Sequence, residues 1–357
     1  MRYLQPLPLQ CVVQRVVDVG SRGMDKYQQS LVGDFFSETP GLSPAVCHQI
    51  CTELLSSSVP LGVAVKVEPV DFQGSLSYSC FVDVSDDCGE RKIMQFRHSE
   101  FDTSSNSKAH SIFGIIVPPV KYLGYHRGLH VYTSSYRLGC PYIQLLQRPE
   151  GEPPVSHRIQ TATDLSLVFV QGLCFDDSQT KPPTANSTVS SLRTAITSLE
   201  CDVKCKALLD RALFAIQRNA ALIDSLPTVL AHEDLTPFNY LVEPSTGRVT
   251  AVLDWDGATP KRVGHNLHFA VHLFGCITLD GWEDYPERES IESEFRSSIC
   301  ERLSAQGIED LASFLFSMEL SQALGLLEYY VPRMENDKAG LWEKFLVTLL
   351  QRLSWEK

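Results

Sequence analysis

The sequence predicts an α+β fold with two lobes, an antiparallel sheet lobe at residues 1–135 and a larger helical lobe at 136–357. Strand-like segments gather before residue 135, and long helical segments follow Pro141. A single short hairpin interrupts the helical part. A chain of 357 residues is long enough to bury a large core in such an arrangement.

The N-terminal part reads as a helix followed by strands. Ser43-Pro44 is typical of a helix N-cap with proline at the first helical position, and it opens a helix over 45–55. A bend at 72–79 separates the first two strands of an expected antiparallel meander, and a short helix is expected at 104–114. Strands are expected at 62–70, 76–84, 91–97, 120–125 and 129–135.

The C-terminal part has helical periodicity with one β interruption. Residues 176–191 are rich in Ser, Thr and Pro and predict a surface loop. Residues 239–255 predict two short strands joined by a turn at 244–247. Helices are expected at 162–175, 204–226, 312–331 and 338–353.

The composition excludes several classes of partner. The formal net charge is −12, whereas a nucleic-acid-binding surface usually needs a basic stripe, so we expect no nucleic-acid partner. The first 20 residues lack the apolar core of a signal peptide, and no stretch reaches the ~18 apolar residues of a membrane span. We therefore expect a cytoplasmic protein with no membrane partner. The sequence predicts no oligomeric state.

The cysteines agree with a reducing compartment. Eleven of them are scattered without a CxxC pair, so neither a disulfide framework nor a zinc ribbon is indicated. Cys47, His48 and Cys51 offer an alternative, a metal site on one helix face. Buried cysteines commonly fill such faces, and we favour that interpretation.

The chemistry of the chain is concentrated around the hairpin. If the chain folds back at the turn, Asn239 and Asp254 meet at the open end, and oxygen ligands held close together suit Mg²⁺. Asp234, five residues before Asn239, would face the same cleft as a free carboxylate. Such a set suits phosphoryl transfer, with one carboxylate receiving the acceptor proton and the other two residues holding metal. Taken singly, each residue could instead belong to a turn or a strand end.

The stretch HEDLTPFNYLV…GRVTAVLDWDGA resembles the H-G-D-x-x-x-x-N-[IV]-L-V…I-D-W-[EA]-x-A signature of the aminoglycoside phosphotransferase family, to which choline kinases are related. The segments FQGSLSYS and VYTSSYRLGCPYI resemble a fungal branch of that family. The resemblance implies a protein-kinase-like fold and a small-molecule kinase that uses ATP and Mg²⁺. It also implies a catalytic base at Asp234, metal ligands at Asn239 and Asp254, and a structural role for His232.

The resemblance also implies where the nucleotide would bind. Arg97 replaces the lysine that usually holds the α- and β-phosphates on the third strand, and Lys92 is the alternative. A phosphate loop is implied at the first hairpin bend, where a plain β-turn is the alternative. A hinge is implied between the lobes, where the base would lie against the main chain. The implied nucleotide-binding residues are Arg97, Gly74, Ser75, Ser134 and Tyr136.

Two departures from the family pattern leave the activity open. Glu233 stands where the family usually has glycine, and the helix at 104–114 has no acidic residue to pair with Arg97. Three hypotheses therefore remain: an active small-molecule kinase, a fold-sharing biosynthetic enzyme with other chemistry, and a pseudokinase that acts as a binding module. A serine or cysteine hydrolase is disfavoured because no GxSxG sequence is present.

The expected partner is a small-molecule substrate whose pocket would be built from the C-terminal helices. Acidic and aromatic residues there could hold an amine, or could be ordinary surface and core residues. These candidates are Trp282, Glu283, Asp284, Tyr285, Glu319, Glu328 and Tyr329.

Overall fold

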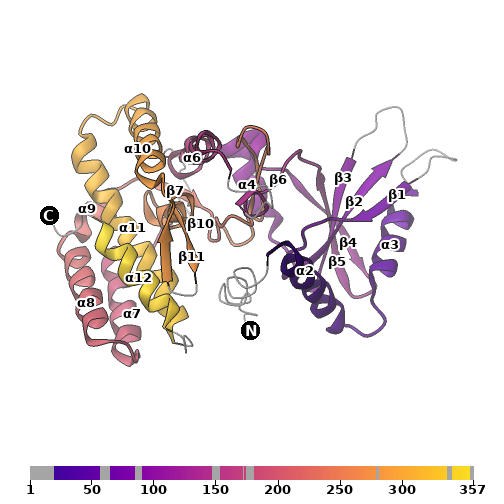
Figure 1. Ribbon diagram of the computed structural model, residues 1–357, viewed down its shortest axis with the longest axis horizontal. Coiled ribbons are helices and arrows are strands. Elements are labelled where there is room, and N and C mark those ends of the chain that lie inside the picture. The colour runs from indigo at the N-terminus through magenta and orange to yellow at the C-terminus, as the bar shows by residue number, and fades with distance from the viewer. Residues whose placement is uncertain are drawn as a thin grey trace.

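The computed structural model describes residues 20–56, 65–84, 91–146, 153–171, 173, 181–278, 281–335 and 340–353. The sheet and the main group of helices lie at opposite ends of an elongated molecule (Figure 1). Between them lie helix α4 (Thr103–Phe113), helix α6 (Val155–Val170) and strand β6 (Cys140–Pro141). This arrangement confirms the predicted α+β fold. The division into lobes at residue 135 stays a prediction.

The sheet lobe contains five antiparallel strands in the order β1-β2-β3-β5-β4. All five lie where the sequence predicted strands. Buried residues alternate along β2, where Tyr78, Cys80 and Val82 point into the core, as expected for a strand with one buried face. The strands are β1 (Val65–Pro69), β2 (Ser77–Val84), β3 (Arg91–Arg97), β4 (Val120–His126) and β5 (Leu129–Ser135).

Two helices cover the sheet lobe (Figure 1). Helix α3 (Pro44–Ser56) begins as predicted, because the Ser43 hydroxyl accepts a hydrogen bond from the Val46 main-chain N–H at 3.4 Å. Helix α2 (Gly20–Ser37) was not predicted. Its Phe35 belongs to the same buried core as the strands.

The buried cysteines of this lobe fill the core. Cys47, Cys51 and Cys80 are fully buried among apolar residues. Burial raises the pKa of the Cys47 thiol well above its ordinary value. Within the described residues no group of three His, Cys, Asp or Glu side chains could hold a metal ion, so the alternative of a metal site at Cys47 gains no support.

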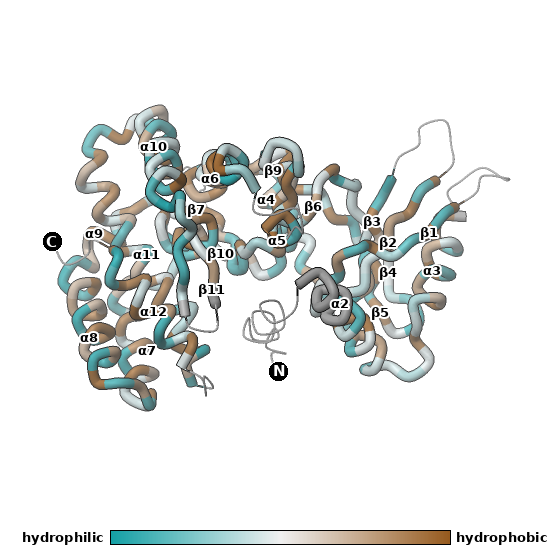
Figure 2. Tube along the Cα trace, in the orientation of Figure 1, coloured by the Kyte–Doolittle hydropathy of each residue, from teal (hydrophilic) through white to brown (hydrophobic). Residues whose placement is uncertain are grey.

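The helical lobe packs most of its helices around α11. Hydrophobic and hydrophilic residues alternate along these helices (Figure 2), so each has a face for the core. In the described part of the chain, no helix is both long and apolar enough to span a membrane. The remaining helices are η1 (Gly114–Ile116), α5 (Tyr142–Leu146), α7 (Ala185–Ser198), α8 (Val203–Arg218), α9 (Ala220–Ser225), η2 (His265–Leu273), α10 (Arg288–Ala305), α11 (Leu311–Met334) and α12 (Leu341–Arg352).

The loop predicted at 176–191 is wrong in its second half, because α7 begins at Ala185. The hydroxyl of Thr184 caps this helix by accepting from the Ser187 main-chain N–H at 3.3 Å. Apolar residues at helical spacing, including Val189 and Leu192, are buried against α8 and α11. The Ser and Thr content of the outer face concealed this period. Residues 176–180 lie outside the described part of the chain.

Two other helices have different bounds from those predicted. The helix expected at 204–226 is divided into α8 and α9, and the break falls at Asn219. The Asn219 side chain donates to the Ala215 carbonyl at 2.9 Å, which satisfies a main-chain group at the end of α8. The helix expected at 162–175 starts earlier, at Val155, and ends at Val170.

The single β interruption predicted for the helical lobe is incomplete, since three small sheets occur in the described residues. The predicted hairpin is confirmed: β8 pairs antiparallel with β9, and Gly247 in its turn has a φ of 75°, which glycine adopts without strain. The strands of these sheets are β7 (Thr228–Ala231), β8 (Tyr240–Val242), β9 (Val249–Val252), β10 (Thr259–Arg262), β11 (Gly275–Thr278) and β12 (Gly281–Asp284), together with β6.

Candidate functional site

The hairpin of β8 and β9 brings Asn239 and Asp254 to its open end, as predicted. Asn239 directly precedes β8 and Asp254 follows β9, and the Leu253 main-chain N–H donates to the Asn239 carbonyl at 2.7 Å. The φ of Asp254 is 57°, in the left-handed region that few residues other than glycine adopt. Such backbone conformations cluster at functional sites, because the surrounding structure must offset their cost.

His232 supports this end of the hairpin from inside the protein. Its Nδ1 accepts from the Asp234 main-chain N–H at 3.1 Å, so Nε2 carries the proton and donates to the Leu253 carbonyl at 2.7 Å. Burial lowers the pKa of His232, which favours this neutral form. The ring also packs edge-on against buried Trp255. These contacts agree with the structural role implied for His232.

Asp234 opens onto a cleft, but it is not the free carboxylate that was predicted. The Asn239 amide donates to its Oδ2 at 2.9 Å, and the Tyr329 hydroxyl donates to its Oδ1 at 3.3 Å. The carboxylate is in contact with solvent yet crowded by protein. This desolvation and the negative charge of Asp254 raise the pKa of Asp234 to about 6, although Tyr329 and Arg333 act in the opposite direction.

Arg97 connects the sheet lobe to this site. Its side chain is only 4% exposed, and its guanidinium binds Asp254 (Nη1 to Oδ1, 3.5 Å) and Asp256 (Nη2 to Oδ2, 3.0 Å). Helix α4 has no acidic residue for it, as the sequence indicated, and the segment after β9 supplies both carboxylates instead. The main-chain N–H of Asp102, just before α4, donates to Asp256 at 3.1 Å. Lys92 does not line the cleft.

Glu233, which stands where the family usually has glycine, contacts β10. Its carboxylate accepts a hydrogen bond from the Thr259 hydroxyl and lies 4.0 Å from the Lys261 ammonium, both on β10. Lys261 also pairs with Glu328 of α11 at 3.0 Å, and His265 contacts the other oxygen of that carboxylate at 3.3 Å. Glu233 therefore connects the loop before Asp234 to β10, and Lys261 connects β10 to α11.

The cleft between the lobes has a volume of about 530 Å³ and is lined by every residue predicted for the site. On one side lie the first hairpin bend and β5, and on the other lie the β8–β9 hairpin and α11. The main-chain N–H of Tyr136 already donates to the Arg91 carbonyl at 3.2 Å. The predicted residues along the cleft are Gly74, Ser75, Arg97, Ser134, Tyr136, Asp234, Asn239 and Asp254.

The first hairpin bend is held by a side chain rather than by glycine geometry. The Gln73 amide donates to the Val70 and Ser79 carbonyls at 2.8 and 2.9 Å, and its oxygen accepts from the Ser79 N–H at 2.7 Å. A Cβ added at Gly74 would meet its nearest neighbour at 3.4 Å, an ordinary contact, so this position does not require glycine. The bend nevertheless faces the cleft.

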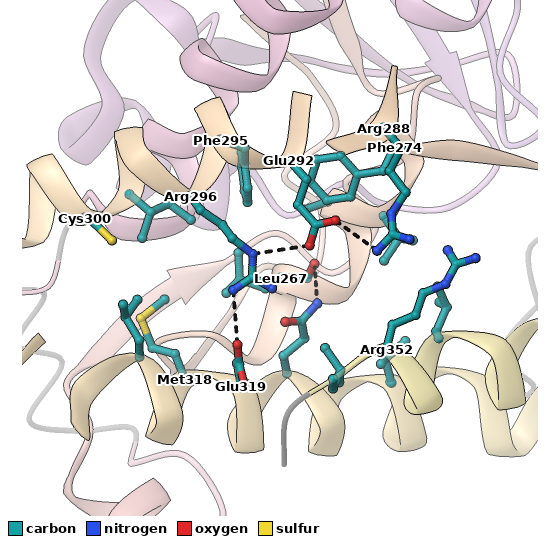
Figure 3. Close-up of a pocket in the computed structure, with 18 of the residues that line it drawn as sticks. Leu267, Phe274, Arg288, Glu292, Phe295, Arg296, Cys300, Met318, Glu319 and Arg352 are labelled. Carbon is teal, nitrogen blue, oxygen red and sulfur yellow. Dashed lines mark hydrogen bonds and ion pairs between the residues drawn. The ribbon is translucent and has the colours of Figure 1, made fainter. Parts of the chain in front are cut away.

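A second cavity, of about 240 Å³, lies between α10 and α11 in the helical lobe (Figure 3). Of the predicted amine-binding residues, Trp282 and Glu319 line it, and none of the hairpin constellation does. Glu319 is held by Arg296 at 3.1 Å (Figure 3). Asp284 pairs with Arg352 at 2.6 Å, and Glu328 with Lys261. The acidic candidates Asp284, Glu319 and Glu328 are thus neutralised by basic neighbours.

Two residues were missed as site residues from the sequence. Asp256 does not line the cleft, but it forms the shorter ion pair with Arg97, which does. Arg333 was not noticed, although it lines the cleft one helical turn after Tyr329. Tyr329 and Arg333 lie one turn apart on the same face of α11, and this spacing is the sequence signal that could have linked Arg333 to the site.

Comparison with known proteins supports this interpretation of the site. The model of the phosphotransferase enzyme family matches residues 176–282, which include Asp234, Asn239 and Asp254. A search of curated proteins found no match.

Solved structures agree in fold. Choline kinase from Cryptosporidium parvum Iowa II is 12% identical with a TM-score of 0.53, covering 85% of this chain and 94% of its own. The macrolide 2'-phosphotransferase MphH from Brachybacterium faecium is 16% identical with a TM-score of 0.51, covering 83% and 98%. At such identities the likeness shows the shared fold alone.

Proposed function

We propose that this protein is a small-molecule kinase, which transfers the γ-phosphoryl group of Mg-ATP to a hydroxyl or amine of a metabolite. The observation that carries the proposal is the convergence of Asp234, Asn239 and Asp254 in one cleft between the two lobes. The match of the phosphotransferase enzyme family to the segment containing all three supports it. Membership of a fungal branch and a cytoplasmic location remain predictions.

Asp234 is the proposed catalytic base. Its carboxylate faces the cleft, and its orientation is fixed on one side by the Asn239 amide and on the other by the Tyr329 hydroxyl. It would receive the proton of the acceptor hydroxyl as that oxygen bonds to phosphorus and the bond to the ADP leaving group breaks. The two fixed hydrogen bonds reduce the reorganisation that this role requires.

Asn239 and Asp254 are the proposed metal ligands, and the donor set fits Mg²⁺. The amide nitrogen of Asn239 is occupied by Asp234, which leaves its side-chain oxygen as a ligand beside the Asp254 carboxylate. Oxygen donors of this kind, completed by water and phosphate oxygens, suit Mg²⁺. A bound Mg²⁺ would neutralise the charge of the transferring phosphate.

Arg97 is proposed to bind the nucleotide phosphates, and this role requires it to share or release Asp254. Metal binding at Asp254 would compete with the 3.5 Å ion pair, whereas the 3.0 Å pair with Asp256 can persist. Asp256 therefore keeps the guanidinium in the cleft in both states. The base is proposed to lie against the main chain near Ser134 and Tyr136, through groups other than the occupied Tyr136 N–H.

The pairing of Arg97 with Asp254 also favours the second candidate, a binding module without catalysis. In that case the ion pair would lock the two lobes together and leave no metal site. The difference lies in whether magnesium and nucleotide can displace Arg97 from Asp254.

Calorimetric titration with ATP, with and without Mg²⁺, separates the two. We expect Mg-dependent binding that Asp254→Asn weakens ~10-fold or more, since a charged ligand is lost, and that Asn239→Ala weakens less. Arg296→Gln, outside the cleft, is the control and should bind normally. Absence of Mg-ATP binding would reject the kinase. Equal affinity in wild type and Asp254→Asn would reject the metal assignment.

A further inference from the structure

Asp234 has a metal side and an α11 side. Its Oδ2 accepts from Asn239, a proposed metal ligand, whereas its Oδ1 accepts from Tyr329 on α11. An acceptor hydroxyl that transfers its proton to Asp234 without entering the metal shell would approach from the α11 side. The residues beyond Tyr329 therefore decide which acceptor fits.

Arg333 lies at this position. Its guanidinium carbon is 3.5 Å from the centre of the Tyr329 ring, and one of its nitrogens donates to the Tyr329 carbonyl. The side chain is half-buried and lines the cleft. Stacking on the ring fixes the direction of the planar guanidinium, which makes it suited to a carboxylate or phosphate group.

Among the residues that the structure describes, Arg333 forms no ion pair with a carboxylate, although its charge acts on Asp234 across the cleft. Two other arginines of the cleft do have such partners, since Arg97 pairs with Asp254 and Asp256, and Arg91 pairs with Asp83 at 2.7 Å. Arg137 also lines the cleft, but it directly follows Tyr136, where the base of the nucleotide is proposed to lie. The charge of Arg333 is thus available at the acceptor end.

We propose that the α11 side of the cleft binds an acceptor that carries a carboxylate or phosphate group, and that Arg333 recognises this group. The proposal rests on the proposed kinase function. Three of the four acidic residues expected to hold an amine, Asp284, Glu319 and Glu328, form ion pairs with basic neighbours, which argues against an amine pocket built from them. The acceptor is then an anionic hydroxy or amino compound rather than a cationic one.

The test is calorimetric titration of the protein loaded with Mg²⁺ and a non-hydrolysable ATP analogue, which occupies the nucleotide phosphate sites. The probes share a small polyol or alcohol body: D-glycerate, glycerol 3-phosphate, glycerol and choline. At least one anion should bind ~10-fold or more tightly than glycerol and choline. Which anion is preferred decides between carboxylate and phosphate. Glycerol or choline binding as tightly as the anions, or no anion binding at millimolar concentration, would overturn the proposal.

Variants assign the effect to Arg333. Arg333→Gln should weaken the preferred anion ~10- to 100-fold, Arg333→Lys should retain part of the affinity, and Arg296→Gln should bind as wild type. Thermal unfolding checks that each variant is folded. Anion binding unchanged in Arg333→Gln contradicts the assignment, as does anion binding that occurs only without nucleotide. Failure of the nucleotide itself to bind would instead reject the kinase function, and the anions would then be titrated against the free protein.

Discussion

The cleft between the lobes and the cavity between α10 and α11 differ in whether their charged side chains form ion pairs. In the cleft, Asp234 and Asp254 lie close enough for one to raise the pKa of the other, and Arg333 acts on Asp234 without forming an ion pair among the described residues. Around the helical cavity Arg288, Glu292, Arg296 and Glu319 form ion pairs with one another (Figure 3), and Arg352 pairs with Asp284 beside the cavity. Charged side chains that lack ion-pair partners, rather than apolar cavity volume, therefore indicate where a ligand binds or a reaction takes place.

The largest effect should come from the carboxylate at the centre of the cleft. Asp234→Asn keeps the size of the side chain and a hydrogen-bond acceptor for Tyr329, but it cannot receive a proton. Turnover with the acceptor found above should fall ~10²-fold or more, while Mg-nucleotide affinity is retained. Steady-state kinetics and calorimetry measure the two separately.

The matched control is Asp210→Asn, the same change at an exposed position of α8. It should alter neither turnover nor nucleotide affinity. Near wild-type turnover in Asp234→Asn would show that this carboxylate is structural and that the proposed mechanism is wrong.

The sequence predicted the fold and the members of the site better than it predicted their partners. Strand periods and the turn at 244–247 are local signals, so the sheet and the β8–β9 hairpin lie where expected. Helix α7 was missed because its apolar face is sparse among Ser and Thr residues. The ion pairs of Arg97 join residues 157 and 159 positions apart, and no local pattern encodes such contacts.

Among the sites, the acceptor end was the least predictable. Acidic residues near the C-terminus suggested an amine pocket, but three of the four are neutralised by arginines and a lysine from other elements. Arg333 reaches the cleft only because α11 packs beside the loop of Asp234. Tertiary packing, which composition does not show, therefore sets the charge of this end.

A smaller effect is expected in the helical lobe, where a buried histidine should make the stability of the protein depend on pH. Burial lowers the pKa of His272 to about 4, where it packs between Trp282 and Phe345. The unfolded chain binds this proton below its ordinary pKa of ~6.5, so stability falls as pH drops from there towards 4. At pH 5 the loss from this one residue is about 2 kcal/mol.

His272→Phe keeps an aromatic ring in place and removes the titration. Urea unfolding at pH 7 and pH 5 should show a smaller difference between the two pH values in the variant than in the wild type, by about 2 kcal/mol. An equal difference in both proteins would show that His272 is not held neutral in the folded state.

The smallest effect should come from the rim of the helical cavity. Arg296 is half-exposed and contacts Glu292 at 3.2 Å and Glu319 at 3.1 Å. Exposed ion pairs contribute little, because solvent screens the charges and two long side chains must be ordered, so Arg296→Gln should lower the free energy of unfolding by about 1 kcal/mol or less. The loss should shrink further at ~1 M NaCl, where the screening length is ~3 Å. Denaturant unfolding at low and high salt measures both values.

Because Arg296 and its two carboxylate partners lie outside the cleft, Arg296→Gln should change neither turnover nor Mg-nucleotide affinity. A fall in either would mean that the helical cavity takes part in the reaction, and that ion pairing on a rim does not distinguish a structural cavity from a functional one.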